Sequence, residues 1–402
     1  MTDPTPRPGH LTAVFLGSMP FIFLNFGLPI RADELGFGAV AIGGMYAVFT
    51  GTMLIVRPLV GHALDRFGRR WFFTSAFIFY CASMTAFARG SGLDDFYFAR
   101  FLQGIGASLM WVSARTIIAD IYAAAERGQA MGKLTTTSTR GAMLGGFYGF
   151  TLLGFLPMQE AWMWAFSGYA LAALVALFWS INKVKESATH LDPVLGISQL
   201  AASEARLLNT LTKLPQSRDL RRLLLVIFLS AFASALIEPL YLLYLRNKFD
   251  LDPITLAFLF LPAGLVYATV PQHAGHWSDR FGRGRLIALG VSFAGLTSIA
   301  LPLWDSVLLV AMFYVLFAVG WSIAGPAEEA LIADLSPAHL RGTIIGAKEA
   351  TAGIGAATGP LLGGAIYDYW SHELAFIING TLLFCAALLV LRWFRTPAHH
   401  KA

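Results

Sequence analysis

Long apolar stretches alternate with short polar segments along the whole chain of 402 residues. A stretch of about 20 apolar residues is long enough for a helix to cross the hydrocarbon core of a membrane. The alternation predicts an all-α membrane protein with twelve transmembrane helices. The first stretch has no small-residue cleavage site, so we expect a retained helix there and not a signal peptide. The expected helices cover residues 11–30, 39–63, 71–88, 96–118, 129–155, 161–182, 222–245, 254–274, 285–303, 307–332, 343–366 and 374–394.

The second half of the chain repeats the first at a fixed offset of 214 residues. Residues 61–70 return as 275–284, and Asp120 returns as Asp334. A fixed offset indicates two copies of one folded unit, and copies in the same direction are typical of transporters with two similar halves. The segment between the copies is either an amphipathic helix on the inner membrane surface or a plain tether. The expected parts are an N-terminal six-helix bundle at 1–182, a cytoplasmic linker at 183–218 and a C-terminal six-helix bundle at 219–402.

Composition supports the membrane class. Hydrophobic residues make up 56% of the chain and charged residues 13%, about half the charged share of a soluble domain. The net charge of +5 does not indicate a nucleic-acid partner, because Lys and Arg gather in every second loop between apolar stretches. That distribution predicts two cytoplasmic termini. The expected location is a plasma membrane, the inner membrane of a bacterium. Cys81 and Cys385 lie inside apolar stretches without metal or redox spacing, so we expect neither a metal nor another cofactor.

The loop after the second expected helix has the pattern G-x-x-x-D-R-x-G-R-R at residues 61–70. Gly61 would allow close approach of helices, and Gly68 would permit a tight turn. Asp65 can accept hydrogen bonds from the amino end of a neighbouring helix. Arg69 is placed to make a charge-assisted bond with a carboxylate. A plain basic cytoplasmic loop is the alternative interpretation.

This loop, its copy at 275–284 and the repeat resemble the major facilitator superfamily. The resemblance implies two pseudo-symmetric six-helix bundles that alternate in access. It also implies that Asp65 meets the start of the eleventh helix near Gly346, while Arg69 pairs with Asp120. The loop would then be a conformational latch. Its expected members are Gly61, Asp65, Arg66, Gly68, Arg69, Asp120, Asp279, Arg283 and Asp334.

A second pattern, Arg100 to Ala107 in the fourth expected helix, is similar to the R-x-x-Q-G motif of the drug and proton antiporter branch. The resemblance implies a role for Arg100 in proton coupling. The fifth expected helix departs from that branch, because Gly145-Gly146 is not preceded by a Gly-Pro pair. The Gly-Pro form occurs only in the second copy, at Gly359-Pro360. Proton-coupled uptake therefore stays open beside efflux.

Ionisable side chains inside the expected helices are candidates for function, because a charge in a membrane usually faces a cavity or a partner. Glu238 is the only deep carboxylate of the seventh expected helix, just before Pro239. We expect it to be buried and to be the proton site; a paired structural carboxylate is the alternative. An Arg115 to Glu329 bridge could form a cytoplasmic gate, unless these charges pair within each half. The gate or cavity charges are Arg57, Arg115, Arg140, Glu328, Glu329, Lys348 and Glu349.

Aromatic and amide side chains are expected to line the substrate cavity beside these charges. The mixture favours an amphipathic or zwitterionic organic solute, although such aromatics also pack against neighbours. The expected lining residues are Asn25, Tyr46, Gln103, Trp111, Tyr241, Tyr244 and Trp321.

The patterns favour a secondary active transporter that exports a drug or metabolite with proton coupling. The chain lacks the G-x-x-x-x-G-K-[ST] pattern, which disfavours direct ATP hydrolysis. A transport-inactive receptor would not need a latch. An enzyme would need a nucleophile or metal cluster, and His273 with His276 lacks further ligands nearby. The expected partners are a small-molecule substrate, protons and the lipid bilayer, for a monomer.

Overall fold

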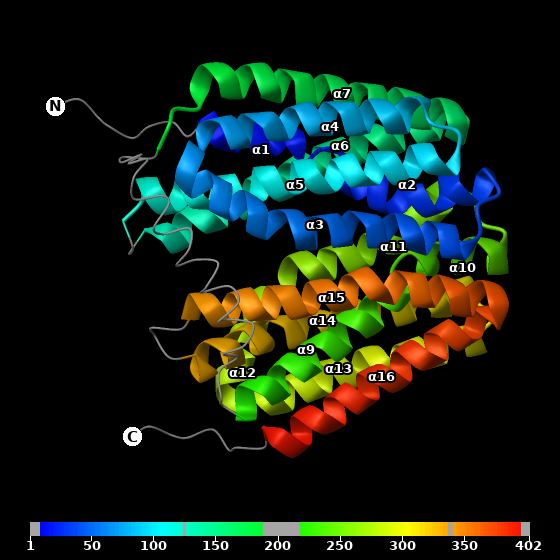
Figure 1. The fold of residues 1–402 in the computed structure, drawn as a ribbon. Coiled ribbons are helices and arrows are strands. Elements are labelled where there is room, and N and C mark those ends of the chain that lie inside the picture. The colour runs from blue at the N-terminus through cyan, green and yellow to red at the C-terminus, as the bar shows by residue number, and fades with distance from the viewer. Residues whose placement is uncertain (1–8, 124–125, 188–217, 337–340, 395–402) are drawn as a thin grey trace. The chain divides into compact units, whose positions relative to one another are not determined.

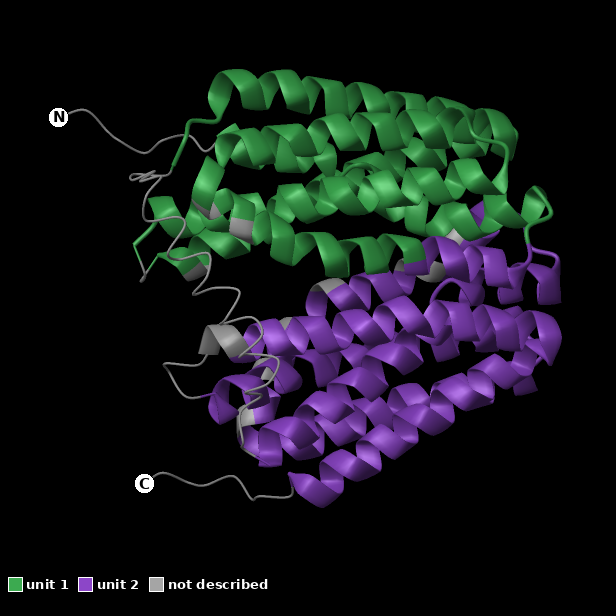
Figure 2. Ribbon diagram, viewed as in Figure 1, with its two compact units in different colours: residues 1–37, 48–203 green, residues 38–47, 204–402 purple. Residues whose placement is uncertain are grey.

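The computed structural model describes residues 9–123, 126–187, 218–336 and 341–394, and every regular element in these ranges is helical (Figure 1). The all-α expectation is confirmed. The expected linker falls mainly on residues 188–217, outside the described ranges. The chain forms two compact units, residues 1–37 with 48–203 and residues 38–47 with 204–402 (Figure 2).

Seven helices precede the undescribed segment 188–217. They are α1 (Gly9–Gly17), α2 (Pro20–Glu34), α3 (Ala39–Phe67), α4 (Arg70–Arg89), α5 (Leu93–Ile121), α6 (Arg127–Phe155) and α7 (Met158–Lys183). The α3 helix begins in unit 2 and continues in unit 1.

The helices after that segment all belong to unit 2. They are α9 (Arg218–Ile237), α10 (Leu240–Phe249), α11 (Pro253–Thr269), α12 (Pro271–Phe281), α13 (Arg283–Ala300), α14 (Val307–Leu335), α15 (Arg341–Tyr369) and α16 (His372–Trp393), with a short 3₁₀ turn η1 at Leu301–Leu303.

Three of the twelve expected membrane spans consist of two helices each instead of one: α1 with α2, α9 with α10, and α11 with α12. A proline stands at each break, namely Pro20, Pro239 and Pro271. Proline has no N–H to donate and its ring clashes with the preceding turn, so it starts a helix more readily than it continues one. By length and apolar composition alone, nine segments of the described chain could cross a membrane. The other three expected spans are α6, α11 with α12, and α15, which are also helical.

Inside each unit, a glycine-bearing helix packs closely on the broken helix that begins the unit's repeat. A Cβ at Gly145 in α6 would clash with the backbone of Met19, between α1 and α2. Its copy in α15, Gly359, would meet the backbone of Phe232 in α9. Only glycine permits these contacts. The two copies of the 214-residue repeat therefore also share a close contact between helices.

Candidate functional site

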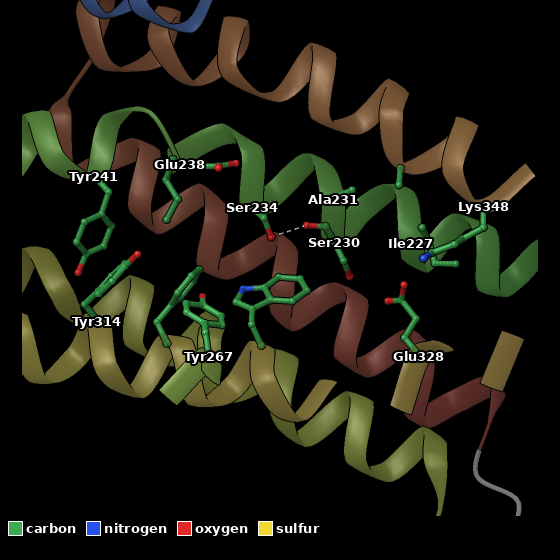
Figure 3. Close-up of a pocket in the computed structure, with 14 residues that line it drawn as sticks. Ile227, Ser230, Ala231, Ser234, Glu238, Tyr241, Tyr267, Tyr314, Glu328 and Lys348 are labelled. Carbon is green, nitrogen blue, oxygen red and sulfur yellow. Dashed lines mark hydrogen bonds between the residues drawn. The ribbon is translucent and has the colours of Figure 1, made fainter. Parts of the chain in front are cut away.

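A cavity of about 610 Å³ lies inside unit 2, between α9, α10, α11, α14 and α15 (Figure 3). This volume falls within the range of small-molecule sites, about 300–1,000 Å³. Its polar lining comes from two carboxylates, one ammonium group, two serines and several aromatic residues. The lining consists of Ile227, Ser230, Ala231, Ser234, Ile237, Glu238, Tyr241, Tyr267, Tyr314, Phe317, Trp321, Glu328, Lys348 and Ala352.

Glu238 occupies the break between α9 and α10 at one end of this pocket. Its backbone N–H still donates to the carbonyl of Ser234 at 3.2 Å, but Pro239 ends the regular ladder. The Glu238 side chain is exposed, so the expectation of a buried carboxylate is wrong. The cause is the break itself, which turns the chain and leaves the side chain at the open wall of the pocket.

Two tyrosines from other helices share that end of the pocket. Tyr267 of α11 and Tyr314 of α14 both lie within electrostatic range of the Glu238 carboxylate. The ring of Tyr241 in α10 contacts that of Tyr314 in a tilted arrangement, with ring centroids 4.5 Å apart. This end therefore presents a carboxylate beside aromatic faces, the combination that attracts an organic cation.

The other end of the pocket carries Glu328 of α14 and Lys348 of α15, whose charged groups point toward one another (Figure 3). Lys348 also forms ion pairs with Glu329 and, at 3.6 Å, with Glu349. Glu329 therefore pairs with a charge of its own half, as the alternative interpretation of these residues expected. The bridge to Arg115 would join the two units and stays a prediction.

Between the two ends, α9 contributes a stripe of serines on the face that carries Glu238. Ser234 donates its hydroxyl to the carbonyl of Ser230 at 2.8 Å (Figure 3). The Ser230 hydroxyl and the Trp321 indole N–H are buried and have no hydrogen-bond partner among the described residues. Buried polar groups normally have partners, so these two atoms are available to a bound solute. The wall from Ile227 to Glu238 is about 16 Å long at 1.5 Å per residue.

The structure places the expected cavity residues in several different environments. Tyr241 and Trp321 line the pocket. Tyr244 instead packs on Phe376, with ring centroids 4.7 Å apart. The others are outside this pocket: Asn25 is exposed on α2, Tyr46 and Gln103 are buried, and Trp111 is half-buried and stacks under Arg115 at 5.8 Å.

Sequence reasoning missed Tyr267, Tyr314 and the two serines. A signal for the serines exists, because Ser230, Ser234 and Glu238 are spaced by four residues and therefore share one helix face. No comparable spacing connects Tyr267 with Tyr314, which lie on different helices.

Three further expected cationic residues, besides Arg115, belong to unit 1. Arg100 is 1% exposed and donates to the Gln103 side chain at 2.9 Å, while its guanidinium covers the Phe49 ring at 5.4 Å. Arg57 contacts the sulfur of Met53 at 3.4 Å. Arg140 is exposed on α6.

The latch motif has the same local geometry in both copies. The Arg69 Nε lies 3.0 Å from the Asp120 carboxylate, and its repeat partner Arg283 lies 2.8 Å from Asp334. The side chains of Asp65 and Asp279 lie outside the described part of the chain. A contact of Asp65 with the eleventh helix stays a prediction.

Arg66 and Gly61 are two further expected latch members in the described part of the chain. Arg66 covers the neighbouring Phe67 ring at 5.1 Å. A Cβ at Gly61 would lie 4.0 Å from Val112, an ordinary contact. Packing inside unit 1 therefore leaves room for a side chain at this position. This differs from the expectation that Gly61 allows helices to approach closely.

Helices of membrane-spanning length, broken segments and a polar pocket inside an apolar bundle define a membrane transporter. A family model described as "Major Facilitator Superfamily" matches residues 11–213 and 223–402. The chain therefore belongs to the Major Facilitator Superfamily, and it is an integral membrane transporter and not an enzyme.

Curated relatives match nearly the full length. "Multidrug resistance protein 1" of Bacillus subtilis (strain 168) is 25% identical over 404 residues, which cover 97% of both chains. "Multi-drug resistance efflux pump PmrA homolog" of Lactococcus lactis subsp. lactis (strain IL1403) is 25% identical over 385 residues, covering 92% of this chain and 89% of that protein. These names agree with the antiporter branch that the motifs resemble.

Solved structures show the same fold. A D-xylose-proton symporter has a TM-score of 0.74 at 17% identity and covers 98% of both chains. A bacterial homologue of the human lysosomal transporter Spinster, in an inward-facing and occupied conformation, has a TM-score of 0.74 at 15% identity and covers 96% of both chains. The twelve-helix fold expected from the sequence is confirmed.

Proposed function

We propose that this chain exports small organic compounds in exchange for protons, and that Glu238 is the group where substrate and proton compete. The observation that carries the proposal is the position of Glu238, an exposed carboxylate at a helix break in the wall of a pocket of substrate size. Broken helices form the binding sites of many transporters. The names of the curated relatives support the export direction.

The pocket chemistry supports a solute that is aromatic or amphipathic and carries at least one positive charge. The Glu238 end offers a carboxylate and tyrosine faces, while the far end offers both an acidic and a basic group, Glu328 and Lys348. A cationic or zwitterionic solute finds opposite charge at one end or at both. The apolar wall between them favours its hydrocarbon part.

Substrate and proton would be exchanged because the single carboxylate of Glu238 binds only one of them at a time. A carboxylate in the wall of a pocket can bind a proton or attract the positive charge of a solute, but it does not do both at once. Protonation of Glu238 would release the solute, and loss of the proton would allow the next solute to bind. Arg100 remains the proposed second coupling group in unit 1, and the Arg69–Asp120 pair part of a proposed latch.

The remaining features of the proposal concern location and assembly. Lys and Arg gather in every second loop, so we place both termini in the cytoplasm and the chain in the inner membrane of a bacterium. We propose that one chain is sufficient for transport and that nucleic acid has no part in it.

The experiment uses purified protein in proteoliposomes with ethidium, an aromatic organic cation, as the probe. Glu238→Gln should bind ethidium more weakly but keep ethidium counterflow, because Glu328 and the aromatic residues remain in the pocket, and it should lose transport that is driven by a pH gradient. The matched control is Asp305→Asn, which removes an exposed carboxylate of unit 2 outside the pocket. If Glu238→Gln still concentrates ethidium against its gradient, Glu238 is structural. If ethidium instead accumulates in the direction in which protons flow, the protein is a symporter, and uptake replaces export as its function.

A further inference from the structure

A second cavity, of about 710 Å³, lies in unit 2 where the beginning of α9 meets the end of α16. These two helices pack against each other, and their ends lie side by side in Figure 1. On α9 the lining residues follow the spacing i, i+3, i+4, i+7, so they share one helix face. The lining consists of Arg218, Arg221, Arg222, Leu225, Leu389, Arg392 and Trp393.

The positive charge of this cavity is only partly balanced. Arg222 pairs with Asp219 at 3.0 Å, and its guanidinium covers the Trp393 ring at 5.4 Å. Arg218, Arg221 and Arg392 form no ion pair with a carboxylate of the described chain. Charges of one sign around a shared cavity repel one another and concentrate a counter-ion there. The cavity is therefore suited to an anion.

An apolar surface lies next to the arginines, and a free anion would make no favourable contact with it. Leu225 is 49% exposed and lies one turn further along α9 than Arg221 and Arg222. Leu389 is half-buried, one turn before Arg392 and Trp393 at the end of α16. The segment formed by α9 with α10 is long and apolar enough to cross a membrane, and so is α16. Tryptophan at the end of such a segment is typical of the membrane interface.

We propose that this cavity binds the headgroup of an anionic phospholipid. The lipid phosphate would lie among Arg218, Arg221 and Arg392, and an acyl chain would follow Leu225 and Leu389. Guanidinium groups match the geometry of phosphate oxygens, and basic pockets between transmembrane helices bind lipids such as cardiolipin. This site is separate from the Glu238 pocket, because the two share no lining residue.

The test is native mass spectrometry of the full-length protein in detergent, titrated with cardiolipin and, separately, with phosphatidylcholine. The unmodified protein should retain cardiolipin in preference to phosphatidylcholine. Each of Arg218→Gln, Arg221→Gln and Arg392→Gln should weaken cardiolipin binding about fivefold, which corresponds to about 1 kcal/mol per arginine. The triple variant should lose about a hundredfold. Arg285→Gln, which removes an exposed arginine of α13 outside the cavity, should bind cardiolipin like the unmodified protein.

Two further arms identify the source of the anion. Leu225→Asn should weaken cardiolipin binding while leaving the arginines intact, and millimolar inorganic phosphate should not displace the lipid. Displacement by phosphate, or an unaffected Leu225→Asn variant, would show a free-anion site and overturn the lipid assignment. Equal cardiolipin binding by the triple variant and the unmodified protein would overturn the site itself. Far-ultraviolet circular dichroism of each variant verifies that it is folded, and the single variants carry the test if the triple variant is not.

Discussion

The two copies of the signature loop share a glycine turn but have different surroundings. Gly68 and Gly282 both turn the chain at positive φ, 90° and 91°. In the first copy the Asp120 carboxylate also accepts a hydrogen bond from Ser187 at 2.9 Å, and the Arg69–Asp120 side chains are 14% and 23% exposed. In the second copy the Arg283 and Asp334 side chains are 27% and 52% exposed. The repeated residues set the shared geometry, while residues outside the repeat strengthen one copy.

The additional contacts of the first copy come from the segment just after α7. Glu186 accepts hydrogen bonds from the backbone N–H groups of Arg69 and Arg70, at 2.9 and 3.1 Å, at the amino end of α4. At the same offset the second copy has His400 and Lys401 in place of Glu186 and Ser187. Neither of these side chains can act as a carboxylate cap. The comparison therefore predicts that the first loop is held more firmly than the second.

The largest effect is expected from removing the carboxylates that hold the arginines. Asp120→Asn should lower the unfolding free energy by about 2 kcal/mol, because a charged acceptor of two hydrogen bonds is lost. Asp334→Asn should lower it by about 0.5 kcal/mol, as expected for a more exposed pair. Thermal unfolding of both variants in one detergent measures the difference. Equal shifts would show that the two loops are held equally, and would remove the basis of the comparison.

A smaller effect is expected at Glu186, which accepts hydrogen bonds from the backbone N–H groups of Arg69 and Arg70. Glu186→Ala should destabilise the start of α4 by about 1 kcal/mol, the usual value for a lost helix cap with favourable charge. Amide hydrogen exchange of Arg69 and Arg70 reports on this directly. Exchange at Arg283, the copy of Arg69, should be unchanged. Unaltered protection of Arg69 in the variant would show that Glu186 is not its cap.

The sequence predicted the helices well because their signal is local. An apolar stretch of membrane-spanning length identifies a helix without knowledge of its neighbours. The breaks at Pro20, Pro239 and Pro271 were harder to predict, because other prolines, such as Pro58 and Pro326, lie inside continuous helices. Which proline ends a helix depends on packing around it.

The pocket was predictable only in part. Glu238 stood out as a lone carboxylate in an apolar stretch, a local property, and it does line the pocket. Its exposure depended on the break at Pro239, and its tyrosine neighbours Tyr267 and Tyr314 depended on how α11 and α14 face α9. Sequence spacing contains no information about contacts between helices that are far apart along the chain. Lys348 and Glu329 were both named as charges, but their mutual contact required the structure.

The amino ends of α3 and α11 extend the comparison between the copies. Asp252 accepts hydrogen bonds from the backbone of Ile254 and Thr255, both at 3.0 Å, and so caps α11 locally. The same repeat position before α3 is Gly38, which has no side chain that could accept a capping hydrogen bond. The amino end of α3 is capped instead by Asp368 of α15, which accepts from Ala39 and Val40 at 3.0 and 2.8 Å within unit 2. One copy thus uses a local cap, and the other a distant one.

The smallest effect is expected at Asp252, and it should depend on pH. The hydroxyl of Thr255, together with the backbone N–H groups of Thr255 and Ile254, lowers the pKa of the Asp252 carboxyl. Because the folded pKa is lowered, the stabilisation is present above the unfolded pKa of about 3.9. It is lost as the pH falls through the folded value. Asp252→Ala should therefore reduce protection of the Ile254 and Thr255 amides at about pH 6 by about 0.5 kcal/mol, and much less at about pH 3. Amide hydrogen exchange at both pH values measures this loss of protection, and the Ala39 amide is the internal control. A loss of equal size at both pH values would mean that the ionised carboxylate is not what caps α11, and that the local cap acts through the shape of the side chain alone.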